Sequence, residues 1–310
     1  MAPVNTSRIH DIILLGFPSL RRLNTVLFAT LLLIYVFIIS GNALIIFVIR
    51  KESCLHAPMY SFIGAFSALE ICYTAVTIPK MLSNLLDEET KISLNGCLLQ
   101  AYFLHSLGAA ECYLLTTMAY DRYLAICKPL RYSALMTTRV YGKMVAGCFV
   151  SGFLSPVIET ALISRLPFCG PNIIENLFCD FPPLIALACT DTTLYILVEF
   201  VVSSFIILLS SFFVFLSYSR IIQVIFRIQS KEGRKKTFST CGAHLIVVIL
   251  FFGSIAFMYI RVTKSYSLDY DKAVGLTYAV FTPLANPVIY GLRNTEIKNS
   301  IRKRLHRDKI

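Results

Sequence analysis

The sequence predicts an all-α membrane protein: a seven-transmembrane helix bundle followed by a short amphipathic C-terminal helix. Of its 310 residues, 56% are hydrophobic and only 15% are charged. Soluble domains usually contain about 25% charged residues, so this composition indicates that lipid is the solvent. An apolar stretch of about 20 residues is long enough to cross a bilayer as a helix. The chain contains seven such stretches, at 25–49, 58–86, 97–126, 140–163, 193–228, 237–262 and 272–292.

The basic residues between these stretches indicate how the chain is oriented. The formal net charge is +11, and Lys and Arg gather at 50–51, 122–143, 220–236 and 293–309. These clusters fall in alternate loops and in the tail, so the positive-inside rule places the N-terminus outside the plasma membrane. A nucleic-acid-binding protein would not interleave its basic stripe with lipid-length helices, which excludes a nucleic-acid partner. The expected outer loops carry Asp87, Glu88, Glu89, Glu175, Asp180 and Asp191.

Three segments follow from this arrangement: an extracellular N-terminus (1–24), a seven-transmembrane domain (25–292) and a cytoplasmic tail (293–310). No signal peptide is evident before residue 24, so the first apolar stretch is expected to direct insertion. Asn5 begins an Asn-Thr-Ser sequon on the expected outer side and is a glycosylation candidate. The tail spaces Ile297, Ile301 and Leu305 as one apolar stripe on a basic helix, which is typical of a helix along the inner membrane surface. A disordered basic tail is the alternative.

Four cysteines fall on the expected outer side, where the environment is oxidising. They are Cys97 at the start of the third stretch and Cys169, Cys179 and Cys189 in the long loop 164–192. A Cys97–Cys179 bridge would pin that loop over the bundle, and Cys169–Cys189 would then close the loop on itself. Four cysteines allow three pairings, and the spacing alone does not choose between them.

Ionisable residues inside the apolar stretches are candidates for functional roles, because a charge at membrane depth is costly. Glu111 lies ten residues before Asp121-Arg122, which corresponds to about 15 Å along a helix. Glu70 lies in the middle of the second stretch, at a similar depth to Glu111. The two carboxyl groups would either share a proton or hold a cation such as sodium, or each would be protonated separately. No other cofactor is expected.

Several short motifs occur in a fixed order on the expected helices. The longest is Met118–Cys127, with the sequence MAYDRYLAIC, at the end of the third helix. The others are Gly41-Asn42, Pro58-Met59-Tyr60, Ser217-Tyr218, KTFSTCGAH at 236–244 and PLANPVIY at 283–290. From about residue 17 to 305 the chain resembles the vertebrate odorant (olfactory) receptors, which are rhodopsin-like G-protein-coupled receptors.

Features of helix six narrow the resemblance to the tetrapod-type branch, whose ligands are mostly volatile hydrophobic compounds. These features are Phe252-Gly253 and the stretch FMYIR at 257–261. Phe252 stands where the family usually has Tyr, and Glu70 replaces the usual Asp. Gly242 and Ala243 make the start of helix six less polar than is usual. The loss of the Tyr hydroxyl means that ligand preferences cannot simply be carried over from relatives.

The resemblance implies a signalling switch at the inner face. Arg122 would be held at rest by Asp121 and neighbouring polar groups, and an outward swing of helix six would free it. Asn286-Pro287 makes helix seven deformable, because Pro removes a backbone hydrogen bond. The partner would be a heterotrimeric G protein of the olfactory stimulatory type, which raises cyclic AMP, in the membrane of olfactory cilia. The switch set is Asp121, Arg122, Tyr123, Tyr218, Asn286, Pro287 and Tyr290.

The resemblance places an odorant pocket in the outer half of the bundle. Candidates on helices three and six recur at i, i+3, i+4 and i+7, so each set shares one helix face. Simple helix packing gives the same spacing and stays an alternative. His105, Ser203 and Tyr259 are the hydrogen-bonding candidates in a mostly apolar pocket. The full set is Leu104, His105, Gly108, Ala109, Cys112, Val202, Ser203, Ile206, Phe252, Ile255, Ala256, Tyr259, Leu276 and Ala279.

Other classes of protein fit less well. An aminergic receptor would need an acid on helix three, where Leu104 stands at the matching level. A retinal opsin would need a Lys in helix seven, but 273–292 contains none. A transporter or channel would leave the Asp121-Arg122-Tyr123 motif unexplained, and no inverted repeat is visible. No nucleophile–base set or phosphate loop suggests an enzyme.

Overall fold

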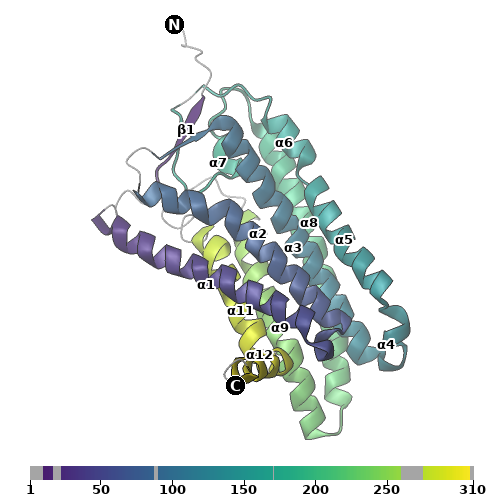
Figure 1. The fold of residues 1–310 in the computed structure, drawn as a ribbon. Coiled ribbons are helices and arrows are strands. Elements are labelled where there is room, and N and C mark those ends of the chain that lie inside the picture. The colour runs from purple at the N-terminus through teal and green to yellow at the C-terminus, as the bar shows by residue number, and fades with distance from the viewer. Residues whose placement is uncertain (1–9, 17–21, 87–89, 170, 260–274, 308–310) are drawn as a thin grey trace, which may run out of the picture.

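The computed structural model describes residues 10–16, 22–86, 90–169, 171–259 and 275–307. Long helices run roughly side by side and form one bundle (Figure 1). The elements that correspond to the first six expected spans are α1 (Asn24–Lys51), α2 (Pro58–Leu86), α3 (Leu94–Cys127), α5 (Thr138–Leu154) with α6 (Val157–Ile163), α8 (Thr193–Arg227) and α9 (Lys231–Tyr259). The seventh is η3 (Thr277–Phe281), α11 (Thr282–Val288) and η4 (Ile289–Arg293); shorter elements are η2 (Ser53–Leu55), α4 (Pro129–Leu135), α7 (Phe181–Ile185) and α12 (Thr295–Arg307).

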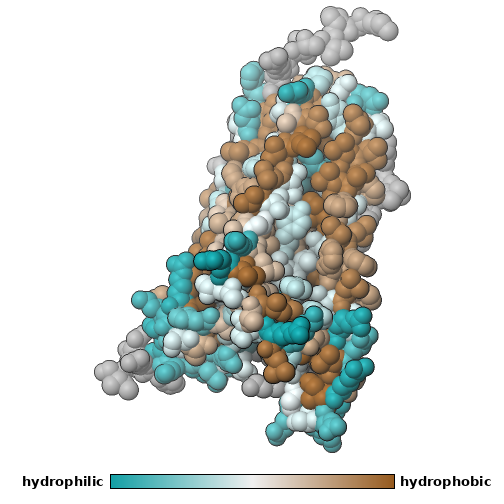
Figure 2. Space-filling view, turned by 90° about the vertical axis from the view of Figure 1, so that its right-hand side faces the viewer, coloured by the Kyte–Doolittle hydropathy of each residue, from teal (hydrophilic) through white to brown (hydrophobic). Residues whose placement is uncertain are grey.

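Helix length and composition agree with a membrane protein. Among the described residues, α1, α2, α8 and the α5–α6 pair are each long and apolar enough to cross a bilayer. The third helix is equally long but carries three charged residues, and the purely apolar part of α9 is limited to Cys241–Ala256. Apolar side chains cover much of the visible surface between the ends, and hydrophilic residues gather at the lower end (Figure 2). Exposed residues such as Leu33, Phe205 and Phe215 therefore face the lipid.

Several expected helix boundaries were wrong for identifiable reasons. Helix six begins at Lys231 rather than at residue 237, because the polar residues before the apolar stretch continue the helix. Helix four is interrupted between α5 and α6 at Pro156, whose nitrogen cannot donate a backbone hydrogen bond. Helix three begins at Leu94, where Oγ of Ser93 caps it by accepting a 3.1 Å hydrogen bond from Gly96 N.

A small sheet, which the sequence had not predicted, closes one end of the bundle. It consists of β1 (Asp11–Leu14), β2 (Lys91–Ser93) and β3 (Ile173–Ile174), in the order β2-β1-β3. The first two strands pair antiparallel and β3 pairs parallel to β1. Since Ile12 and Leu14 are fully buried, the described part of the N-terminal segment contributes to a hydrophobic core. Asn5, the glycosylation candidate, lies outside the described residues.

The bundle has two chemically different ends, which we call the disulfide end and the α12 end. The disulfide end carries the sheet and the bridges of Cys97 and Cys169. At the α12 end, α12 packs against the end of α1, where Nε of Arg304 lies 2.8 Å from Oε1 of Glu52. The expected amphipathic C-terminal helix is thus present, and its Ile297 is fully buried in the bundle core.

The third helix forms the centre of the bundle and packs closely against helix four. A Cβ atom added at Gly152 of α5 would lie only 2.6 Å from Cβ of Ala110 and 2.8 Å from the backbone oxygen of Ser106. Real Cβ atoms do not approach that closely, so the glycine is what permits this contact. Most of α3 is buried, including residues that the sequence predicts to line the ligand pocket or to form the signalling switch.

Candidate ligand pocket and signalling switch

A cavity of about 50 Å³ lies against α3 in the half of the bundle nearest the disulfide end. We call it the α3 cavity. Its wall comes from α3, α8, α9 and η3, and most of the lining side chains are apolar. The lining residues are Leu104, His105, Gly108, Ala109, Cys112, Ser203, Ile206, Ile207, Ile255 and Tyr278.

The structure brings eight of the fourteen proposed pocket residues together around this cavity. Ile207 and Tyr278 also line it and were not among the candidates. Val202, Phe252, Ala256 and Ala279 do not line it, and the side chain of Tyr259 lies outside the described residues. Phe252 instead packs edge-to-face against Phe251, with ring centroids 5.3 Å apart.

Tyr278 joins the α3 cavity to two other helices. A Cβ atom at Gly108 would lie 2.6 Å from its hydroxyl oxygen, so this ring end reaches directly over α3. The Tyr278 ring centroid lies 5.2 Å from that of Tyr73 on α2 and 6.0 Å from that of Phe251 on α9. Helical periodicity defined candidates only on helices three and six, so Tyr278 on the seventh helix was not among them. It lies in η3, a π-helix, whose wider turn changes which residues share a face.

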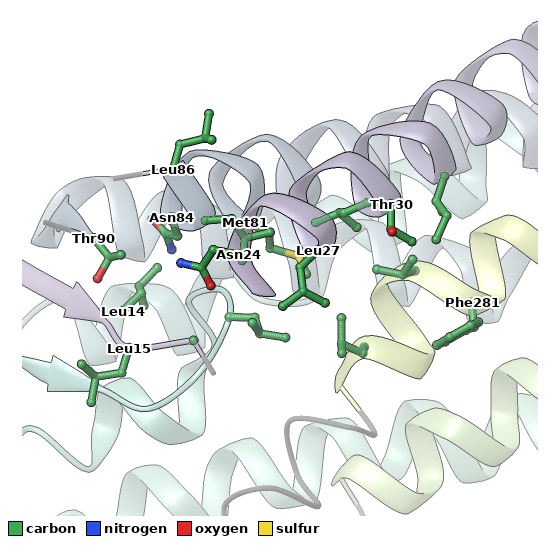
Figure 3. Close-up of a pocket in the computed structure, with 17 residues that line it drawn as sticks. Leu14, Leu15, Asn24, Leu27, Thr30, Met81, Asn84, Leu86, Thr90 and Phe281 are labelled. Carbon is green, nitrogen blue, oxygen red and sulfur yellow. The ribbon is translucent and has the colours of Figure 1, made fainter. Parts of the chain in front are cut away.

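A larger cavity of about 820 Å³ lies between α1, α2 and the seventh helix (Figure 3). We call it the lateral cavity. Leu276, expected in the odorant pocket, lines this cavity instead, together with Val280 and Phe281. The two cavities have no described lining residue in common.

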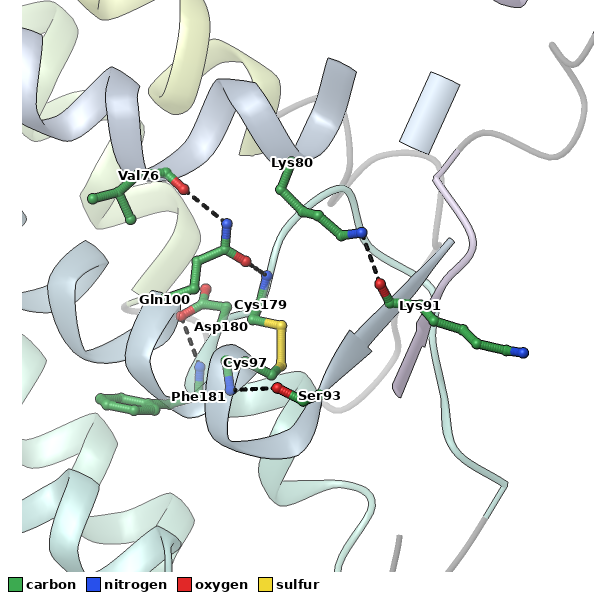
Figure 4. Close-up of a disulfide and its surroundings, with 10 residues drawn as sticks. Val76, Lys80, Lys91, Ser93, Cys97, Gln100, Cys179, Asp180 and Phe181 are labelled. Atoms are coloured by element: carbon green, nitrogen blue, oxygen red, sulfur yellow. Dashed lines mark hydrogen bonds between the residues drawn. A yellow bond between two sulfur atoms is a disulfide. The ribbon is translucent and has the colours of Figure 1, made fainter. Parts of the chain in front are cut away.

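Two disulfides hold the long loop over the bundle. The bridges are Cys97–Cys179 and Cys169–Cys189, the pairing that would pin the loop and then close it on itself. Gln100 on α3 reinforces the first bridge, since its Oε1 accepts a 2.9 Å hydrogen bond from Cys179 N (Figure 4). Its Nε2 donates to the backbone oxygen of Val76 on α2, also at 2.9 Å. The loop is therefore fixed to α3, and Gln100 links α3 in turn to α2.

A buried histidine–aspartate contact connects this loop to the α3 cavity. Nε2 of His105 lies 2.7 Å from Oδ1 of Asp180, and the two side chains are only 9% and 3% exposed. The imidazole also stacks on Phe181, with ring centroids 4.2 Å apart. Two further buried carboxyl groups, Glu159 of α6 and Glu199 of α8, lie within electrostatic range of His105. One end of the α3 cavity is thus polar, although its other walls are apolar.

Glu199 extends this polar region towards the cavity wall. Its Oε1 accepts a 3.3 Å hydrogen bond from Oγ of Ser203, which lines the α3 cavity. Glu159 and Glu199 were not among the predicted site residues, although both are isolated acids in apolar stretches. That isolation was a usable signal, because an ionisable group in a span usually faces the interior.

The acidic pair in the middle of the bundle is also buried. Nδ2 of Asn286 donates a hydrogen bond to Oε1 of Glu70, while the other Glu70 oxygen has no partner among the described residues. Glu111 is 2% exposed and close enough to Glu70 for the two groups to interact electrostatically. The described residues contain no group of three or more His, Cys, Asp or Glu side chains that would hold a metal ion.

The residues of the proposed switch meet near the α12 end, with one difference from expectation. Asp121 accepts a 2.8 Å hydrogen bond from the hydroxyl of Tyr132 on α4, and no ion pair joins it to Arg122 in the described part of the chain. Burial, followed by the Asp121 carboxylate, raises the pKa of Tyr132 above its usual range, so the hydroxyl remains a donor. Arg122 itself is 6% exposed.

Helices five and six are joined beside Arg122. The hydroxyl of Tyr218 lies 2.7 Å from Nδ1 of His244 and 3.3 Å from the backbone oxygen of Cys241. His244, which was part of a quoted motif but not of the proposed switch, is fully buried. Tyr218, His244 and Tyr290 all lie within electrostatic range of the Arg122 guanidinium.

The remaining switch residues belong to the ends of helices three and seven. The hydroxyl of Tyr290 is buried without a partner among the described residues, and its ring packs edge-to-face on Phe66. Pro287 touches α1 so closely that a Cβ atom at Gly41 would lie 2.8 Å from Cβ of the proline. Tyr123 is half-buried, and Nζ of Lys128 lies 5.9 Å from its ring centroid.

Comparison with known proteins agrees with this arrangement. The family described as "Olfactory receptor" matches residues 31–308. Human olfactory receptor 6N1 is 54% identical over 303 residues, which is 98% of this chain and 97% of its own length. Human olfactory receptors 6K3 and 6K2 are 50% and 48% identical over 96% and 100% of this chain and 90% and 96% of their own lengths. The chain therefore belongs to the olfactory receptor family, whose members are seven-transmembrane, G-protein-coupled odorant receptors and not enzymes.

Proposed function

We propose that this receptor binds a small, mostly hydrophobic volatile in the α3 cavity. The observation that carries the proposal is a cavity with mostly apolar walls and one polar end, formed by four separate helical elements. His105 and Ser203 would orient a ligand that has a hydrogen-bonding group. Pockets for drug-sized ligands are usually about 300–1,000 Å³. Since the α3 cavity is only about 50 Å³, the ligand must be small, and lining side chains must move to admit it.

Tyr278 offers a route from the cavity to the switch. A ligand that displaces this ring would also press on Phe251 of α9, the helix that carries His244. Movement of α9 would separate His244 from Tyr218 and leave Arg122 free to bind a G protein. We infer that the partner is a G protein of the olfactory stimulatory type and that cyclic AMP rises as a result.

The proposed orientation places the disulfide end outside the plasma membrane and the α12 end in the cytoplasm. Disulfides persist in an oxidising environment, and the basic clusters adjoin the α12 end. The N-terminus (1–24) would be extracellular and glycosylated at Asn5, the membrane domain would span 25–292, and the tail (293–310) would be cytoplasmic. By likeness to its relatives, the receptor would act in olfactory cilia.

A sodium ion is a second proposed ligand, between Glu70 and Glu111. The unpartnered Glu70 oxygen supports it, because a buried carboxylate oxygen usually has a partner. Titration of sodium against receptor activation would test this site. Sodium-insensitive activation in the parent, unchanged in Glu70→Ala and Glu111→Ala, would favour protonated acids instead. No other cofactor is proposed.

The α3 cavity is tested by screening volatiles for cyclic AMP responses in cells that express the receptor with an olfactory-type G protein. Once an agonist is found, Ile206→Phe should raise its half-maximal concentration about tenfold or more, because the larger ring fills the cavity. Leu208→Phe on the same helix is the matched control, since Leu208 is 58% exposed and faces lipid. Equal responses from the two variants at equal surface level would reject the α3 cavity as the agonist site.

A further inference from the structure

The lateral cavity is large, and its lining has a distinct chemical character. Every described residue that lines it is uncharged, and most are Leu, Ile, Met, Val or Phe. A carboxylate, ammonium or phosphate group buried there would lose its hydration without gaining a charged partner among the described lining residues, which is strongly unfavourable. The ligand chemistry that fits these walls is therefore neutral and largely apolar.

One end of the lateral cavity is polar. Asn24, Asn84 and Thr90 lie towards the same end, whereas Phe281 lies at the other (Figure 3). Both Oδ1 and Nδ2 of Asn84 are buried and have no hydrogen-bond partner among the described residues. Buried side-chain amides are normally hydrogen-bonded, so we expect these two atoms to have a hydrogen-bond partner. Because both atoms are covered in this structure, the side chain must turn towards the cavity to meet a ligand. An alcohol hydroxyl would then satisfy both atoms, because it donates one hydrogen bond and accepts another.

The cavity also reaches the surface that faces lipid. Thr30 of α1 and Phe281 of the seventh helix both line it, and both are exposed, Phe281 by 56%. A membrane-dissolved molecule would enter sideways between α1 and the seventh helix. Its polar group would then lie at the disulfide end, and its apolar body would extend towards Phe281.

We propose that the lateral cavity binds a neutral, hydroxyl-bearing amphiphile whose hydroxyl is held by Asn84. A membrane sterol and a long-chain aliphatic alcohol share this chemistry. The volume of about 820 Å³ accommodates either molecule. No described residue lines both the lateral cavity and the α3 cavity, so the proposal does not depend on where the odorant binds.

The test measures binding to the purified full-length receptor in lipid nanodiscs, without a G protein. The probes are tritiated cholesterol in one arm and tritiated 1-dodecanol in the other, each competed with its own unlabelled alcohol or methyl ether. The alcohol should compete about tenfold better than the ether, because the ether cannot donate to Oδ1 of Asn84. Asn84→Leu should abolish this preference, since it removes both polar atoms.

A matched pair of variants on α1 tests the location. Leu27→Phe should fill the cavity and reduce binding about tenfold, while Leu33→Phe should not, because Leu33 is 72% exposed and does not line the cavity.

Saturable binding of cholesterol alone would identify the bilayer as the source of the ligand. Saturable binding of dodecanol alone would identify a ligand supplied from outside the bilayer. Either result supports the proposal. No saturable binding in both arms, or an alcohol preference that survives Asn84→Leu, would overturn it. Ile206→Phe changes the α3 cavity and should leave binding in the lateral cavity unchanged. Failure of one proposed site can therefore be distinguished from failure of the other.

Discussion

The hydroxyl of Tyr218 on α8 lies 2.7 Å from Nδ1 of His244 on α9, and the two rings stack with centroids 5.8 Å apart. This contact joins the two helices beside the buried Arg122. Any outward movement of α9 at the α12 end must break it. The Tyr218–His244 contact is therefore a restraint on activation that the proposed switch did not include.

Removal of this restraint should raise signalling without odorant. A buried hydrogen bond contributes about 1 kcal/mol, so His244→Ala should raise basal cyclic AMP by roughly fivefold. Basal cyclic AMP at matched surface level is the measurement, with Ser217→Ala on α8 as the control. Basal signalling equal to that of the parent would show that the contact does not hold the resting state.

The His105–Asp180 pair should stabilise the outer loop. Asp180→Asn keeps the shape of the side chain but removes the charge that His105 faces at 2.7 Å. Hydrogen bonds to charged groups contribute about 1.5–3 kcal/mol, so the unfolding temperature of the purified receptor should fall by roughly 5 °C. Glu175→Gln in the same loop is the control, because Glu175 is exposed. Equal unfolding temperatures for the two variants would argue against a stabilising pair.

The close approach of α5 to α3 should make Gly152 intolerant of any larger residue. Gly152→Val would place Cβ 2.6 Å from Cβ of Ala110 and 2.8 Å from backbone oxygen, which cannot move away cheaply. We expect a loss of at least about 1–3 kcal/mol and a large fall in surface receptor. Gly147→Val on the same helix has nothing within 4 Å of the added Cβ and should reach the surface normally. Similar surface levels for both variants would contradict this packing.

Gly108 should limit the size of the agonist. Gly108→Ala places a methyl group 2.6 Å from the Tyr278 hydroxyl, so the ring end must shift and the α3 cavity becomes smaller. Responses to the larger members of an agonist series should fall most, by about tenfold. Adding Tyr278→Phe removes the clashing oxygen and should restore part of the response. A double variant no better than Gly108→Ala alone would exclude this contact as the cause.

Much of the fold was predictable because a lipid environment imposes simple rules. Stretches of lipid length and clusters of basic charge located the helices, and four cysteines marked the loop that two disulfides now fix. The ends of the helices were less predictable, because polar residues such as Lys231 can continue a helix beyond the apolar stretch. The β-sheet was missed because its strands are short and come from three distant segments.

The candidate site was predictable on regular helices and less so elsewhere. His105, Gly108 and Ala109 line one cavity because α3 is a continuous α-helix. Their spacing in the sequence therefore predicts that they share one face of the helix. Tyr278 was missed because no periodic set of candidates was defined on the seventh helix, where η3 is a π-helix. Contacts between helices, such as that of Asp121 on α3 with Tyr132 on α4, depend on how the chain turns between them and leave no periodic pattern in the sequence.

The most direct test of the account is the odorant-evoked cyclic AMP response of Arg122→Ala, because Arg122 is the point at which ligand binding is proposed to reach the G protein. Arg131→Ala on α4, an exposed position, serves as the control. At equal surface level, Arg122→Ala should lose the response and Arg131→Ala should keep it. A full response from Arg122→Ala to an agonist of the parent receptor would contradict the proposed switch.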